Sequence, residues 1–214
     1  LTGGLDKDGN LVGLHMRISG QSILASLLPQ NLVNGMDPAT FQGVMAQGVE
    51  AAYGYSVPNL LIDHAMRNPH LTAGFWRGVN INQNAIYMEC FMDELAKAAG
   101  QDPLEFRRKL MAKNPKGWAV LKAVADQGGW GQPLPKGSGR GLAAFYCFGS
   151  YIAACAEVSV SASGKLTVKR IVAAQLGKRV AVAASSQVAS AATPNSISKR
   201  LRPERPSEVR LVTL

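Results

Sequence analysis

The chain has 214 residues, of which 47% are hydrophobic and 17% charged, a composition that excludes global disorder and low-complexity architecture. The formal net charge of +9 would by itself favour an anionic partner such as nucleic acid. However, residues 176–214 carry a net charge of +5 and residues 1–175 only +4. The last segment has no aromatic residue, whereas basic nucleic-acid sites usually interleave aromatic side chains. The sequence therefore does not indicate binding to nucleic acid.

The first part of the chain is predicted to open with two strands. Hydrophobic residues alternate with polar or small ones from 11 to 19, which is typical of a strand, and Asp8-Gly9 supplies a turn from an earlier strand near Leu5. Residues 20–28 are expected to form a short helix and residues 29–38 a loop. A further strand is predicted near residues 53–58.

Three helices are predicted in the middle of the chain. The first begins near Gln83 and ends at Gly100, with one apolar stripe formed by Tyr87, Phe91, Leu95 and Ala98.

The second helix has Asp102 as its N-cap and Pro103 in its first turn, and the third spans residues 116–127. We expect Arg107, Arg108 and Lys109 to complement the negative C-terminal end of the second helix.

Two strands follow, at residues 156–161 and 165–172, joined by a turn at Ser163-Gly164. The sequence therefore predicts an α+β fold, with mixed or antiparallel strands and a central cluster of helices. Composition changes near residue 175, so we expect one domain over residues 1–175. Residues 176–214 are interpreted as a basic tail rich in alanine, serine and arginine, with no ordered structure predicted.

Residues that could hold a metal or act as nucleophiles give weak signals. The three cysteines, Cys90, Cys147 and Cys155, lie in apolar surroundings and are predicted to be buried hydrophobic residues. The histidines have no metal-ligand spacing, so no metal ligand and no catalytic residue is predicted. Asp63-His64 would be an acid–base pair only if adjacent side chains converged, which helices and strands do not allow. The apolar run 141–156 is shorter than the ~20 residues needed to span a membrane, so no membrane span is predicted.

The segment 74–83 is the best candidate for a functional site. Backbone amides near the start of a helix favour an anion, and Arg77 adds a bidentate donor. The alternative is a tight turn with Trp76 in the core and Arg77 at the surface, which physical arguments alone favour.

Two motifs in this part of the chain resemble a known family. Residues 75–80 read Phe-Trp-Arg-Gly-Val-Asn, and residues 102–107 read Asp-Pro-Leu-Glu-Phe-Arg. Both resemble the molybdopterin-binding large subunit of the xanthine dehydrogenase/aldehyde oxidase family, in particular the isoquinoline 1-oxidoreductase beta-subunit type. The resemblance covers about residues 1–175.

This resemblance implies a molybdenum–molybdopterin cofactor and part of a molybdopterin-binding domain. The implied reaction is hydroxylation of an aldehyde or N-heteroaromatic compound with oxygen from water, and the implied partner is a small [2Fe-2S] subunit. The implied cofactor-binding residues are Arg77, Gly78, Val79 and Gln83, and Trp76 is the implied substrate-binding residue.

Two parts of the family pattern are absent from the sequence. It contains no Gly-Gln-Gly loop, Gly20-Gln21-Ser22 being different, and no Gly-Glu dipeptide for the general base. We therefore expect a fragment of a longer subunit that is inactive alone, with residues after about 175 either read out of frame or derived from a degraded gene. Two alternatives stay open: a remnant or subunit-interface piece that binds no cofactor, and a basic binding module that uses the tail.

Overall fold

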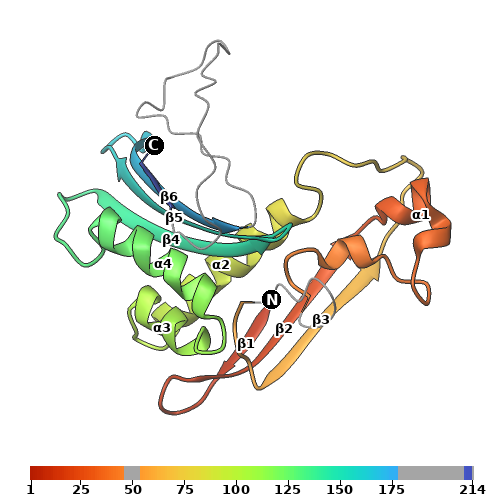
Figure 1. The fold of residues 1–214 in the computed structure, drawn as a ribbon, viewed down its shortest axis with the longest axis horizontal. Coiled ribbons are helices and arrows are strands. Elements are labelled where there is room, and N and C mark those ends of the chain that lie inside the picture. Colours follow the sequence, from red (N-terminus) through yellow and green to blue (C-terminus); the bar gives the residue numbers. More distant parts are fainter. Residues whose placement is uncertain (46–53, 178–209, 214) are drawn as a thin grey trace, which may run out of the picture. The chain divides into compact units, whose positions relative to one another are not determined.

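The computed structural model describes residues 1–45, 54–177 and 210–213 (Figure 1). The chain divides into two compact units. The N-terminal unit comprises Leu1–Pro115 with Phe145–Phe148, and the C-terminal unit comprises Lys116–Ala144 with Gly149–Leu214. Each unit is described by itself.

The N-terminal unit contains a three-stranded sheet in the order β1-β2-β3. β1 (Thr2–Leu5) pairs antiparallel with β2 (Leu11–Gly20), and β2 pairs in parallel with β3 (Asn59–Met66). The alternation predicted for β2 holds at Leu14 and Met16, which are buried, but fails at the start of the strand, where Val12 is exposed and Leu11 is buried. The turn before β2 depends on Gly9, which has a φ of +75°.

The connection from β2 to β3 is more structured than predicted. It contains α1 (Ile23–Leu27) and the 3₁₀ helices η1 (Pro29–Asn31) and η2 (Pro38–Phe41). The prediction of a plain loop over 29–38 is therefore wrong, because Pro29 and Pro38 each start a short helix. The strand predicted near residues 53–58 is also misplaced, since residues 54–58 form no strand and β3 begins at Asn59.

The first two predicted helices are present as α2 (Ile81–Ala98) and α3 (Pro103–Leu110). The N-cap of α3 is confirmed, because Asp102 Oδ1 accepts hydrogen bonds from the backbone N–H groups of Leu104 at 2.9 Å and Glu105 at 3.1 Å.

The apolar stripe predicted on α2 is wrong. Tyr87 is 48% exposed and Ala98 is exposed, and the buried face is rotated toward another set of side chains. These buried residues are Ile81, Asn84, Met88, Glu89, Met92, Leu95 and Ala96. The stripe failed because two polar residues, Asn84 and Glu89, belong to the buried face.

Glu89 is buried because α3 supplies a partner for its charge. Arg107 is fully buried, and its Nε donates to Glu89 Oε2 at 3.2 Å while its Nη1 donates to Asp93 Oδ1 at 2.6 Å. Tyr55 donates its hydroxyl to Glu89 Oε1 at 2.6 Å. The expectation that Arg107 complements an exposed helix end is therefore wrong, and this residue instead ties α3 to α2 through buried charge.

Electrostatics favour the charged arginine and the neutral phenol in this network. Burial acts to lower the pKa of Arg107, but the negative charge of its partners outweighs burial and raises the pKa above its usual value. Burial, followed by the charge of Glu89, raises the pKa of Tyr55 well above its usual value, so the hydroxyl stays a donor.

The C-terminal unit combines one helix with a sheet in the order β4-β5-β6-β7. α4 (Pro115–Gly128) is followed by β4 (Ser138–Cys147), β5 (Ser150–Val160), β6 (Leu166–Gly177) and β7 (Arg210–Thr213). The pairs β5–β6 and β6–β7 are antiparallel. Residues 178–209 and 214 of the predicted tail lie outside the described residues.

The predicted α+β class with mixed and antiparallel strands is confirmed. Within the described ranges, no helix is long and apolar enough to cross a membrane. Of the cysteines, only Cys155 is buried, whereas Cys147 is partly exposed and Cys90 is exposed on α2. The prediction that all three are buried is therefore wrong.

Candidate functional site

A polar cavity of about 380 Å³ lies in the N-terminal unit, between the end of β2 and the start of α2. Its wall comes from three parts of the chain. These are residues 16–21 and Ile23 with Leu1, residues Thr40 and His64, and several residues between Ala73 and Tyr87. Among the residues that the structure describes, the lining includes Arg17, Ser19, Gln21, Asn80 and Gln83 but no carboxylate side chain. The described part of the cavity therefore offers hydrogen-bonding groups to a ligand.

The structure brings three of the five predicted site residues to this cavity. Trp76, Val79 and Gln83 line it, whereas Arg77 and Gly78 lie in the adjacent turn and do not. Trp76 is 85% exposed, so the alternative that placed its ring in the core is wrong.

The turn before α2 has an unusual backbone. Gly78 has a φ of +89° and Val79 a φ of +46°, which is rare for a β-branched residue. A Cβ on Gly78 would clash with the side-chain amide of Asn82, so only glycine fits here. Asn82 in turn donates its Nδ2 to the carbonyl of Arg77 at 3.0 Å. Such strain persists where the surrounding contacts fix it, and it is frequent at functional sites.

Two asparagines, Asn80 before α2 and Asn84 in its first turns, hold the η2 segment against this helix. Asn80 Nδ2 donates to the carbonyl of Ala39 at 2.8 Å, and Asn84 Nδ2 donates to the carbonyls of Thr40 and Gln42, both at 2.9 Å. Gln83 Nε2 donates to Asn80 Oδ1 at 2.7 Å and so orients it. The helix start therefore fixes the wall that contains Thr40.

A buried aspartate, Asp37, fixes the N-terminal end of η2. Asp37 is fully buried and accepts hydrogen bonds from Ser22 Oγ at 2.7 Å, from the N–H of Leu24 at 3.0 Å and from the N–H of Ala39 at 2.8 Å. It thereby joins the residues after β2 to η2. Sequence reasoning missed this residue, although Asp before Pro38 is a helix-capping signal.

His64 and Asp63 face different partners, as expected for neighbours on a strand. His64 lines the cavity, and its Nε2 lies 3.1 Å from the carbonyl of Gly20, which can only accept, so Nε2 carries the proton. Asp63 instead contacts Nε2 of His15 at 3.0 Å and Nε of Arg17 at 2.9 Å. The hydrogen bonds from Arg17, followed by that from His15, lower the pKa of Asp63 to about 2.

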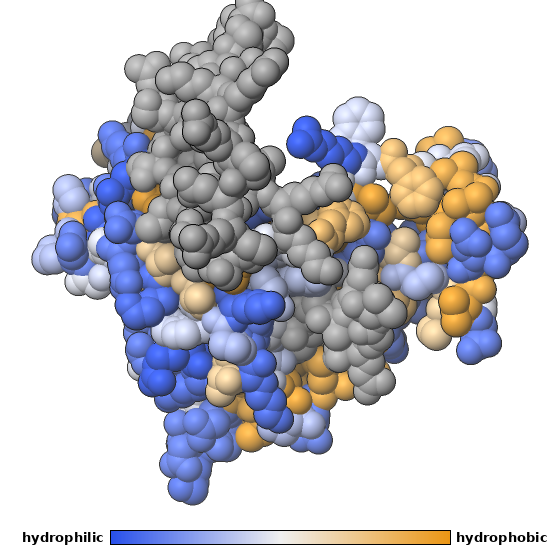
Figure 2. All heavy atoms as spheres, viewed as in Figure 1, coloured by the Kyte–Doolittle hydropathy of each residue, from blue (hydrophilic) through white to orange (hydrophobic). Residues whose placement is uncertain are grey.

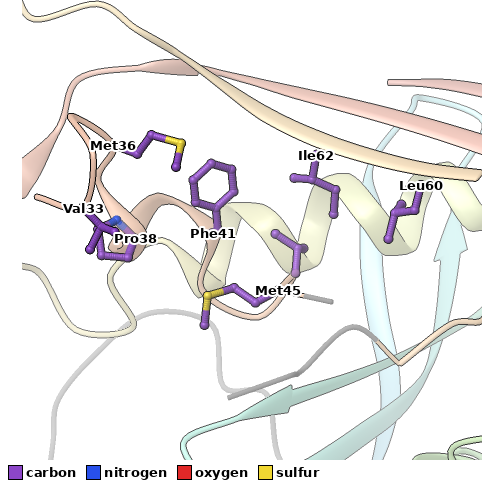
Figure 3. Close-up of a pocket in the computed structure, with 8 residues that line it drawn as sticks. Val33, Met36, Pro38, Phe41, Met45, Leu60 and Ile62 are labelled. Carbon is purple, nitrogen blue, oxygen red and sulfur yellow. The ribbon is translucent and has the colours of Figure 1, made fainter. Parts of the chain in front are cut away.

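A second cavity, of about 520 Å³, is lined by apolar side chains (Figure 3). Its residues are Val33, Met36, Pro38, Phe41, Val44, Met45, Leu60 and Ile62. Phe41 also packs edge-on against His64, with ring centroids 6.3 Å apart, so η2 borders both cavities. Hydrophobic side chains gather on the surface over α1 and the residues after it (Figure 2). They include Leu27, Leu28, Val33 and Met36, which are all exposed. The described residues that line this cavity include no polar side chain with which to orient a reacting group.

Among the residues that the structure describes, no group of three or more His, Cys, Asp or Glu side chains could hold a metal ion. Two buried side-chain oxygens, Oε1 of Gln42 and Oδ1 of Asn84, have no hydrogen-bond partner in the described part of the chain. Both belong to the contact between η2 and α2, and unpaired buried acceptors are typical of sites completed by water or a ligand.

Comparison with known proteins identifies the family to which the N-terminal unit is similar. Residues 1–111 match the family model of the molybdopterin cofactor-binding domain. The chain is 28% identical over 173 residues to the beta subunit of isoquinoline 1-oxidoreductase of Brevundimonas diminuta, an alignment of 78% of this chain and 21% of that protein. It is 30% identical over 131 residues to the B subunit of nicotinate dehydrogenase of Pseudomonas putida, covering 61% of this chain and 11% of that protein.

Among solved structures, aldehyde oxidoreductase from Desulfovibrio gigas is similar with 22% identity and a TM-score of 0.39, over 78% of this chain and 20% of that one. The chain thus spans about a fifth or less of the length of these relatives. The family match covers the strands, the polar cavity and the two helices of the N-terminal unit. The chain therefore belongs to the molybdopterin cofactor-binding domain family, and its relatives include the isoquinoline 1-oxidoreductase beta-subunit type.

Proposed function

We propose that the polar cavity at the start of α2 forms part of the binding site for a molybdenum–molybdopterin cofactor in an oxidoreductase subunit. The observation that carries the proposal is the position of this cavity within residues 1–111, the part matched by the family. Its volume of about 380 Å³ is within the range of small-molecule sites. The amide and hydroxyl side chains among its described lining residues fit an anionic, nitrogen-rich heterocycle.

The predicted site residues divide into two roles in this proposal. Gln83 and the backbone at Val79 contact the cofactor, and Trp76 contacts a flat substrate from the rim. Gly78 acts by allowing the turn, and Arg77, which is exposed, supplies a positive charge beside it. Asn80, Asn84 and Asp37 act as positioning residues, because they hold η2 in place.

The reaction proposed for the whole subunit is hydroxylation of an aldehyde or an N-heteroaromatic compound with oxygen from water. Its relatives' names, isoquinoline 1-oxidoreductase and nicotinate dehydrogenase, support the N-heteroaromatic class. The bound cofactor would supply the redox chemistry, and a small [2Fe-2S] subunit would accept the electrons. The residues of this chain would orient the ring and exclude water.

A subunit-interface role without cofactor is the second candidate. It is favoured by the segment before α2, where Leu71, Phe75 and Trp76 are 67%, 50% and 85% exposed. Exposed apolar side chains in one segment are typical of contact surfaces.

Measurement of molybdenum and of oxidised pterin fluorescence in the purified chain, made in a cell that synthesises the cofactor, separates the two candidates. We expect both signals in the wild type and their loss in Gly78→Ala, because a side chain at a φ of +89° is strained and contacts Asn82. Gly141→Ala is the matched control, since its Cβ meets nothing within 4 Å. A wild-type chain without cofactor, or equal loading of both variants, would contradict the proposal.

A further inference from the structure

The sequence contains one Asn-Gly dipeptide, Asn34-Gly35, and it lies between the 3₁₀ helices η1 and η2. Two backbone hydrogen bonds of 2.9 Å close a turn around it, from the N–H of Val33 to the carbonyl of Met36 and from the N–H of Met36 to the carbonyl of Val33. Asn34 has a φ of +50° and Gly35 a φ of +76°. Positive φ at both central residues is typical of a type I′ turn, for which Asn-Gly is a preferred pair.

The side chain of Asn34 and the backbone nitrogen of Gly35 are both free to react in this turn. Both residues are exposed. In the described part of the chain, neither the carboxamide of Asn34 nor the N–H of Gly35 has a hydrogen-bond partner. A Cβ built on Gly35 would meet nothing within 4 Å, so no neighbouring group crowds this residue. The carboxamide can therefore rotate toward the nitrogen of Gly35 without giving up a hydrogen bond.

We propose that Asn34-Gly35 is a site of spontaneous modification, at which Asn34 converts to aspartate and isoaspartate through a succinimide. The backbone nitrogen of Gly35 gives its proton to solvent and bonds to Cγ of Asn34. The bond between Cγ and Nδ2 breaks, and Nδ2 takes up a proton and leaves as ammonia. Water then opens the succinimide, at Cγ to give isoaspartate's isomer aspartate or at the main-chain carbonyl carbon to give isoaspartate. Nothing is oxidised or reduced, and water is the co-reactant.

The residue that follows each asparagine decides which of them can react in this way. Asn31 is exposed like Asn34, but it is followed by Leu32, whose side chain crowds the attacking nitrogen. Asn68 and Asn114 precede prolines, which have no N–H to lose. Glycine has no side chain beside its nitrogen, so the ring closes with the least hindrance at Asn34.

The modification would change the wall of the apolar cavity. Val33 and Met36, which flank the turn, both line this cavity (Figure 3). Isoaspartate adds a methylene group to the main chain, so the two hydrogen bonds between Val33 and Met36 no longer match. Both products also add a negative charge beside these apolar side chains. The turn therefore couples a slow chemical change to the shape of the cavity.

The test follows the full chain during storage in neutral buffer, by peptide mapping with fragmentation that separates aspartate from isoaspartate. We expect Asn34 to lose its amide at least ~tenfold faster than Asn31, which corresponds to a difference in activation free energy of about 1.4 kcal/mol. In Gly35→Ala the added methyl group crowds the nitrogen, and the rate at Asn34 should fall toward that of Asn31. In the stored wild type, the N–H groups of Val33 and Met36 should exchange with solvent faster than in the fresh chain.

Equal rates at Asn34 and Asn31 would overturn the inference. Unchanged exchange at Val33 and Met36 in a modified chain would overturn the consequence drawn for the cavity wall. Gly35→Ala places a side chain at a φ of +76°, which is strained. If this variant does not fold, the comparison of Asn34 with Asn31 in the wild type decides the question alone. The modification needs no cofactor, so its outcome is independent of the proposed function.

Discussion

The N-terminal and C-terminal units bury different kinds of side chain. Among the described residues, all buried polar or charged side chains belong to the N-terminal unit. They are Ser22, Asp37, Thr40, Asn84, Glu89 and Arg107. The buried side chains of the C-terminal unit that the structure describes are apolar, such as Val120, Leu121 and Val172.

This difference separates two ways of fixing a structure. An apolar core is stabilised by the area it buries and tolerates changes that keep its volume. Buried polar groups cost free energy unless each finds its partners, and they are therefore selective for one geometry. In this chain such groups surround the polar cavity and the α2–α3 contact, which is the region matched by the cofactor-binding family.

Replacement of Arg107 should be the most damaging change in the chain. Arg107→Ala leaves the carboxylate of Glu89, 5% exposed, without its cation, and we expect a loss of about 3–5 kcal/mol in the free energy of unfolding. Urea unfolding followed by circular dichroism measures it. Arg108→Ala is the control, since this neighbour is half exposed and its pair with Glu105 should contribute about 0–1 kcal/mol. Similar losses in the two variants would refute the role given to buried charge.

In the C-terminal unit, substitutions that crowd the apolar core should have the largest effect on stability. A Cβ on Gly128 would come 2.5 Å from Sγ and 2.9 Å from Cβ of Cys155, so Gly128→Ala overpacks the core and should cost about 1–3 kcal/mol. Adding Cys155→Ala removes the sulfur and should recover part of the loss, as a double-mutant cycle would measure. Gly139→Ala, whose Cβ meets nothing within 4 Å, should be close to neutral. A cycle without coupling would show that this contact does not limit the packing.

The sequence allowed the helices and most strands to be predicted because their signals are local. Asp102 and Pro103 marked the start of α3, and the alternation along β2 marked its buried face at Leu14 and Met16. The position of β3 was not predictable in this way, because its register comes from parallel pairing with β2, about 46 residues away in sequence.

The candidate site was predicted only in part for the same reason. The motif around Arg77 located the turn before α2, and Trp76, Val79 and Gln83 indeed line one cavity. The contributions of β2 and of η2 depend on tertiary contacts, such as Asn84 with the carbonyl of Thr40, that no local pattern contains. The burial of Glu89 was not predictable from the sequence either, because hydrophobic periodicity assigns polar residues to the exposed face and does not detect a partner such as Arg107.

Loss of the hydrogen bonds from Asn84 on α2 to the η2 segment should have an intermediate effect on stability. Asn84→Ala leaves the carbonyls of Thr40 and Gln42 without their side-chain donor, and we expect a loss of about 1–3 kcal/mol. The same variant, purified from a cell that synthesises the cofactor, should contain less molybdenum and less oxidised pterin, because the wall containing Thr40 is no longer held. Asn31→Ala, at an exposed position of η1, serves as the control for thermal unfolding and for molybdenum content. Unchanged molybdenum content in a destabilised Asn84→Ala chain would show that the hydrogen bonds of Asn84 stabilise the fold without shaping the cavity.

The smallest effect should come from the exposed charge cluster on the β2–β3 pair, and it should appear only in acid. Asp63 has its pKa lowered from 3.8 to about 2, chiefly by hydrogen bonds from Arg17 and then from His15. A carboxylate with a lowered pKa stabilises the folded state above its unfolded value, and this contribution is lost as the pH falls from about 4 toward 2. In urea unfolding at stepped pH, Asp63→Asn should therefore be less stable than wild type near neutrality and converge with it at the acid end. Asp8→Asn, another exposed aspartate, should run parallel to wild type. If the stability of Asp63→Asn also stayed parallel to that of the wild type at every pH, solvent would screen the interactions of Asp63 with Arg17 and His15. The difference in stabilisation between the two units would then come from buried groups alone.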